Sequence, residues 1–133
     1  MGQSTDAILV YGILLEGEDS DTPEFLGDFD DFEEFVEDAL AMPPYGDPAR
    51  PSYADRDAMI RAYPVTMVTH CSLDYPMYIL AVPGTEITAN RGYAHTFDEW
   101  PHVDGERRAA FHAWAEAHGI EGEGKWILCS MVG

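Results

Sequence analysis

Apolar residues along the chain follow two different periods, which predict where the strands and the helices lie. Four stretches are continuously apolar or alternate apolar with polar residues, as is typical of β-strands. These stretches are Ala7–Leu15, Pro64–Cys71, Met77–Val82 and Gly124–Met131. We expect the first and the last strand to be largely buried. Gly12 inside the first strand predicts a bulge or a close approach of another backbone.

Two other stretches repeat apolar residues every three or four positions, which predicts helices with one apolar face. The first helix is expected from about Phe29 to Met42, with Asp28 as its N-cap. The second is expected from Gly105 to about His118, with Asp104 as its N-cap. Gly119 then occupies the position just beyond the helix end, where glycine is favoured.

The order of these elements predicts one α+β domain over residues 1–133. We expect a two-layer sandwich: an antiparallel four-stranded sheet with two main helices on one face, in the β-α-β-β-α-β, ferredoxin-like order. A proline-rich insert, residues 43–54, follows the first helix. A further short helix is possible over Asp55–Tyr63, capped by Asp55.

The net charge of −18 restricts the partners that this chain can bind. Nucleic acids and anionic membranes repel such a surface, so we expect neither to bind directly. No apolar run approaches the roughly 20 residues that a membrane helix needs. The charge instead predicts a basic protein partner, one that itself binds nucleic acid. The N-terminus lacks the basic start and apolar core of a secretory signal, so we expect a location in the cytoplasm.

The acidic residues are concentrated near the N-terminus: twelve of the 25 lie between Glu16 and Asp38, where there is no Lys or Arg. Carboxylates along a helix roughly imitate phosphates along a nucleic-acid strand. The predicted partner-binding residues are Asp30, Asp31, Glu33, Glu34, Glu37 and Asp38, with Glu16, Glu18, Asp19 and Asp21 as a second patch. The alternative is a solvated helix face whose acids serve solubility.

Signals for catalysis and for metal binding are weak. The acidic loops do not fit a calcium-binding loop, and no His and Cys residues have zinc-ligand spacing. We expect Cys71 and Cys129 to be reduced and buried, and His70 to be half-exposed on the opposite strand face from Cys71. We therefore predict no catalytic residue, no metal and no cofactor. The alternative is a small-molecule enzyme or ligand-binding domain that uses His70, Cys71 and the loop around Arg91.

Several stretches resemble a group of small acidic proteins encoded by tailed bacteriophages and prophages. They are Gln3–Ala7, Thr69–Ser72, Asp74–Leu80 and Lys125–Ser130. The resemblance implies action inside a host cell, since small acidic phage proteins include inhibitors of host defence, such as anti-CRISPR proteins and DNA mimics. The predicted function is therefore inhibition, with the acidic surface blocking the basic groove of a CRISPR effector or nuclease. A third possibility is a phage accessory or structural protein whose acids only confer solubility.

Overall fold

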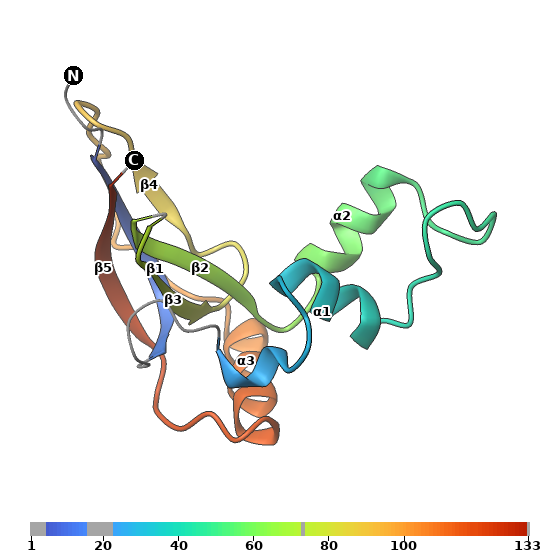
Figure 1. Cartoon of the computed structure of the whole chain (residues 1–133). Helices are drawn as coiled ribbons and strands as arrows, with labels where there is room; N and C mark the ends of the chain where they lie inside the picture. Colours follow the sequence, from blue (N-terminus) through green and yellow to red (C-terminus); the bar gives the residue numbers. More distant parts are fainter. Residues whose placement is uncertain (1–4, 16–22, 73, 133) are drawn as a thin grey trace.

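The computed structural model describes residues 5–15, 23–72 and 74–132 as an α+β fold built on one five-stranded sheet (Figure 1). The strands are β1 (Thr5–Leu15), β2 (Thr66–Ser72), β3 (Pro76–Ala81), β4 (Ile87–Ala89) and β5 (Lys125–Val132). The helices are α1 (Phe32–Ala39), α2 (Tyr53–Arg61) and α3 (Gly105–Ala117), with a 3-10 turn, η1 (Glu24–Leu26), before α1. The four strands and two main helices predicted from the sequence are thus all found, with shifted ends.

Strand β1 organises the sheet because it pairs with three other strands. It runs antiparallel to β5 from Thr5 to Gly12, to β4 around Ile8, and to β3 from Gly12 onward. Strand β2 is antiparallel to β3 and reaches β5 through two parallel pairs, at Cys71 and Ser72. The pairing therefore passes from β1 through β3, β2 and β5 back to β1, so that four strands close on themselves.

The predicted antiparallel four-stranded sheet is wrong in two respects. The sheet is mixed, because the end of β2 runs parallel to β5, and it has a fifth strand, β4. A three-residue strand is too short to produce a recognisable period in the sequence. Strand β5 is also less buried than expected, since Leu128 on it is 75% exposed.

The close backbone approach predicted at Gly12 is confirmed. A side-chain carbon at this position would collide with the carbonyl oxygen of Leu80 and with the Cα of Ala81 on β3. Gly12 pairs with both neighbouring strands, opposite Ala81 on β3 and opposite Lys125 on β5. Only glycine therefore lets β1 and β3 come together at the point where the closed set of strands is completed.

Alternating residues of the strands belong to two separate hydrophobic cores. Ile79 and Ala81 of β3 point into an inner core with Val10 and Val68. The residue between them, Leu80, belongs instead to a second core that the helices cover. This period of two divides the apolar residues between the interior of the closed strands and the face under the helices.

Helices α1 and α3 pack into the same core. Phe32 and Val36 of α1 and Phe111 and Trp114 of α3 all belong to the core that contains Leu80. Helix α3 has its predicted ends, because the Asp104 side chain caps it and Gly119 follows it with a φ of 72°.

Helix α2 is the third helix, beyond the two that the predicted sandwich contains. It packs against α1, and Arg56 is its one buried residue. We call α1, residues 40–52 and α2 the helical arm, which projects from the sheet (Figure 1). Within the described part of the chain, no helix is long and apolar enough to cross a membrane.

Candidate interaction surface

The two helices of the arm begin at caps other than those expected. Asp31, and not Asp28, caps α1, because its carboxylate accepts a hydrogen bond of 2.8 Å from the Glu34 N–H. The turn η1 occupies the preceding segment and delays the helix. Ser52, and not Asp55, caps α2, since the serine hydroxyl accepts from the Asp55 N–H at 3.2 Å. Asp31, one of the predicted partner-binding residues, is thus already used within the fold.

Two of the predicted contact residues, Glu33 and Glu37, are paired with arginines. Arg56 donates from Nε to Glu37 Oε1 and from Nη2 to Glu33 Oε2, both at 3.0 Å. Arg50 also donates to Glu37 Oε1, and its second terminal nitrogen donates to the Pro43 carbonyl at 2.8 Å. These contacts tie α1 to α2 and to the proline-rich connection. We call Arg50, Arg56, Glu33 and Glu37 the arginine clamp.

The clamp is largely shielded from water on the side of Glu37. The side chains of Arg50, Arg56 and Glu37 are 11%, 10% and 17% exposed, whereas that of Glu33 is 65% exposed. Burial alone would raise the pKa of the Glu37 carboxyl, but hydrogen bonds and charge from Arg50 and Arg56 outweigh it and lower the pKa. Hydrogen bonds to Glu33 and Glu37 likewise raise the pKa of the Arg56 guanidinium. Glu37 and Arg56 are therefore both charged at neutral pH.

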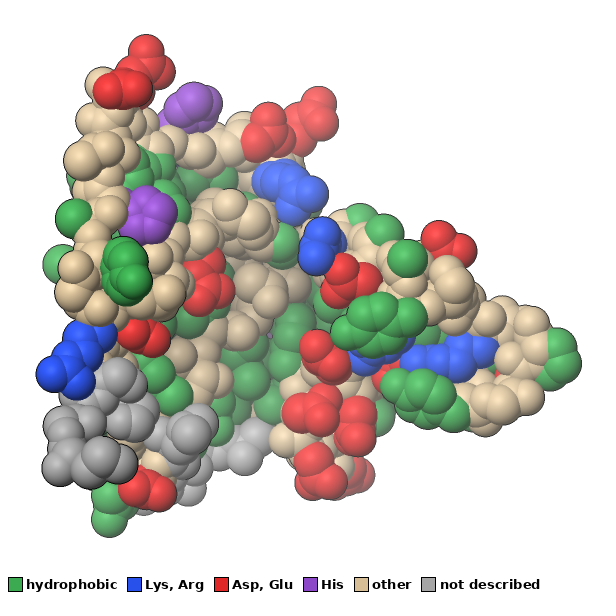
Figure 2. Space-filling model, turned by 90° about the horizontal axis from the view of Figure 1, so that it is seen from above, with side chains coloured by type: hydrophobic (Ala, Val, Ile, Leu, Met, Phe, Trp, Pro, Cys, Tyr) green, Lys and Arg blue, Asp and Glu red, His purple; other side chains and the backbone are tan. Residues whose placement is uncertain are grey.

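The remaining predicted acids of this region lie at the surface. Asp30, Glu34 and Asp38 are exposed, and none of them takes part in an ion pair among the described residues. Their four-residue spacing places Glu34 and Asp38 on one face of α1. Figure 2 shows acidic side chains gathered at the place of α1, beside the base of the arm. We call Asp30, Glu34 and Asp38 the acidic row.

Six of the predicted acids do not belong to the acidic row. Glu16, Glu18, Asp19 and Asp21 lie outside the described residues. Glu33 and Glu37 are held by Arg50 and Arg56 from elsewhere in the arm, so the expectation of a helix without counter-charge is wrong for these two acids. The signal that sequence reasoning missed is the presence of both arginines in or just after the proline-rich insert.

The expected environments of His70 and Cys71 are reversed. His70 is only 8% exposed, on the same strand face as Val68 of the inner core. Its Nε2 is buried and has no hydrogen-bond partner among the described residues, and burial lowers the pKa of the imidazole. Cys71 is half-buried, with a φ of 75° that interrupts the regular alternation of β2. Without a partner at Nε2, this histidine is not activating the neighbouring thiol through that atom.

The loop around Arg91 lies at the same end of the sheet as Cys71. The Arg91 N–H donates to an Asp6 carboxylate oxygen at 3.2 Å, which ties the loop to the start of β1. Asp6 pairs across the strands with Met131, and Met131 pairs with Cys71. In the part of the chain that the structure describes, no three His, Cys, Asp or Glu residues are grouped so that they could hold a metal ion.

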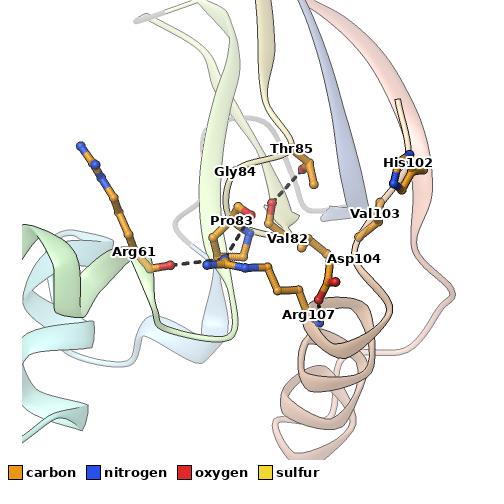
Figure 3. A pocket seen from close by; sticks show the side chains of 9 residues that line it. All are labelled: Arg61, Val82, Pro83, Gly84, Thr85, His102, Val103, Asp104 and Arg107. Carbon is orange, nitrogen blue, oxygen red and sulfur yellow. Dashed lines mark hydrogen bonds between the residues drawn. The ribbon is translucent and has the colours of Figure 1, made fainter. Parts of the chain in front are cut away.

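A cavity of about 330 Å³ lies between the loop after β3 and the start of α3 (Figure 3). Arg107 spans it, and its Nη1 donates to the carbonyl oxygens of Pro83 at 3.3 Å and Arg61 at 3.5 Å. Asp104 uses a carboxylate oxygen to cap α3. The side chain of Arg61 points away from the cavity (Figure 3). These hydrogen bonds join α2, α3 and the loop to one another, so the polar groups of Arg107 and Asp104 are already used within the fold.

We expect Cys129 to react slowly with thiol reagents in the native protein. Both cysteines are free and half-buried, so the expectation of full burial is wrong. Burial raises the pKa of the Cys129 thiol, and the carboxylate of Glu86 raises it further, which reduces the reactive thiolate at pH 7. In a Cys71→Ser variant, maleimide labelling of Cys129 should be several-fold slower than in the unfolded chain. Equal rates in the two states would contradict this.

No model of a known protein family matches the chain, and comparisons with curated proteins and with solved structures found no match.

Proposed function

We propose that the chain is a phage-type inhibitory binding protein that blocks the basic groove of a nucleic-acid-binding host protein, such as a CRISPR effector or a nuclease. The observation that carries the proposal is the acidic row, Asp30, Glu34 and Asp38, which is exposed and has no ion pair among the described residues. Lys and Arg that normally bind phosphates would form charge-assisted hydrogen bonds with these carboxylates. The protein would act in the cytoplasm of the host cell and needs no cofactor for this task.

The proposed roles of the predicted acids differ from one another. Asp30, Glu34 and Asp38 would contact the partner, and Asp31 adds negative charge while it caps α1. Glu33 and Glu37 would act indirectly, because the arginine clamp fixes α1 on the arm before binding. A surface that is already ordered loses less conformational freedom when it binds. The net charge of −18 would also speed the encounter with a basic partner.

Displacement of nucleic acid tests the proposal. The purified chain should displace fluorescently labelled DNA from at least one member of a panel of purified bacterial CRISPR effectors and nucleases. Its affinity should fall steeply as salt is added, because ions screen exposed charges beyond about 8 Å at physiological ionic strength. Combining Glu34→Gln with Asp38→Asn should weaken displacement by about tenfold.

A matched variant separates a binding surface from charge that only confers solubility. Combining Glu106→Gln with Glu116→Gln removes the same charge from two exposed residues of α3. This control should leave displacement nearly unchanged. Equal weakening by both double variants would mean that the acidic row has no specific role. Failure of the native chain to displace DNA from any protein of the panel would refute the proposed function.

A further inference from the structure

A second exposed surface carries aromatic rings. Every residue from 91 to 100, in the segment between β4 and α3, is exposed. The rings of His95, Phe97 and Trp100 contact one another in series, and Trp100 then contacts Trp126 on β5. Trp100 is 63% exposed. We call these four residues the aromatic strip.

The aromatic strip is held in place at both ends. At one end, His95 Nε2 lies 3.0 Å from the Thr88 carbonyl oxygen on β4. At the other, the rings of Trp100 and Trp126 meet edge to face at 6.2 Å, and Trp126 meets Tyr11 of β1 at 5.6 Å. Large rings that stay exposed in a fixed position are typical of the few residues that supply most of the affinity of an interface.

The strip has an apolar neighbour on β5 and two acidic residues within its own segment. Leu128 lies two residues after Trp126, on the same face of β5, and continues the apolar surface. Asp98 and Glu99, which lie between Phe97 and Trp100 in the sequence, are exposed. The sequence has no Lys or Arg from residue 92 to residue 106. The strip therefore offers aromatic faces next to carboxylates, and Arg91 is the one Lys or Arg in the segment between β4 and α3.

Aromatic faces next to carboxylates favour an arginine side chain as the group that binds to the strip. A guanidinium stacks on an aromatic face and can pair with an adjacent carboxylate through two hydrogen bonds, which the rounder ammonium of lysine cannot do as well. Stacked nucleic-acid bases would bring phosphates, which the charge of −18 repels. A second copy of this chain would bring another −18. Charge complementarity thus favours a basic protein over both.

We infer that the aromatic strip is a second binding surface, for arginine side chains of a basic protein. This goes beyond the proposed function, because the strip lies on the sheet side of the molecule and the arm on the other (Figure 1). Either surface can be tested while the other is intact.

Tryptophan side chains provide a direct readout of the strip. The chain has three tryptophans: Trp100 and Trp126 in the strip, and Trp114, which is 9% exposed and donates to the Tyr63 hydroxyl. In a titration with a hexa-arginine peptide followed by NMR, the indole N–H signals of Trp100 and Trp126 should shift while that of Trp114 stays in place. A hexa-lysine peptide of equal charge should cause smaller shifts.

Two variants assign the binding to the strip. Trp100→Ala should weaken hexa-arginine binding by about three- to tenfold. Tyr53→Ala removes a similarly exposed ring from the arm and should have no effect. The variant with Glu34→Gln and Asp38→Asn should keep the indole shifts, so that failure of the acidic row and failure of the strip remain distinguishable.

Three results would overturn the inference. The first is a titration in which neither strip indole moves. The second is equal response to the arginine and lysine peptides, since that would mean attraction by net charge alone. The third is a dimer, detected by sedimentation, that Trp100→Ala dissociates, because a second copy would then be the occupant of the strip.

Discussion

Replacing Glu37 with glutamine should destabilise the helical arm by about 2–4 kcal/mol. Both Arg50 and Arg56 donate to the same oxygen, Oε1 of Glu37. Without the carboxylate, two largely buried guanidinium groups would lie close together, and Arg56 would keep only the exposed Glu33 as a charged partner. Glutamine has nearly the same shape, so the loss reports the charge and not a cavity.

Glu33→Gln is the matched control for this effect. The Glu33 side chain is 65% exposed, and ion pairs that face water contribute less than about 1 kcal/mol. Urea unfolding gives the loss of stability for each variant. Hydrogen exchange of the α2 amides shows whether the loss is confined to the arm. Equal effects of the two substitutions would mean that Glu37 is not the centre of the clamp.

Elements with strong local signals could be predicted closely from the sequence. Helix α3 has both the Asp104 cap and the Gly119 end that the sequence predicts. Gly12 likewise marked a close backbone contact. The start of α1 was ambiguous, because Asp28 and Asp31 are equally good caps by residue type. Contacts of Phe25 with Phe32 and Phe35 accompany the turn before α1, and such packing is not visible in a local pattern.

Features that depend on distant pairing could not be predicted in the same way. The parallel contact between β2 and β5 joins residues about 60 positions apart and leaves no local period. The partners of Glu33 and Glu37 lie 13 to 23 residues further along, in or just after the proline-rich insert. A count of charges within the first helix therefore overestimated how many of its acids lack a partner.

The two sides of β2 explain why the predicted exposure of His70 is wrong. Successive residues of a strand face opposite sides, so burying one of a neighbouring pair exposes the other. Because free cysteine is commonly buried, residue type alone favours Cys71 for the inner side. The alternation through Val68 puts His70 on that side instead.

The free energy of unfolding should decrease as the pH falls from about 7 to 5, chiefly because of His70. Burial lowers the pKa of the folded imidazole, whereas in the unfolded chain it keeps its usual value of about 6.5. Below that pH the unfolded state binds a proton that the folded state does not, so acid favours unfolding. The slope should reach at most about 1.4 kcal/mol per pH unit, and it ends once the pH falls below the folded pKa.

The His70→Leu variant should lose most of this pH dependence. It should also be more stable at pH 7 by about 1–2 kcal/mol, because no polar nitrogen is then buried without a hydrogen bond. His102→Gln, at an exposed position, should keep the native profile. Urea unfolding from pH 5 to 7.5 measures the free energy of unfolding of each variant. The measurement is made in moderate salt, because salt screens the mutual repulsion of the exposed acids. The lowered pKa of Glu37 affects stability only at more acidic pH, below the usual carboxyl value of about 4.5. Parallel profiles for the native chain and His70→Leu would show that another group is responsible.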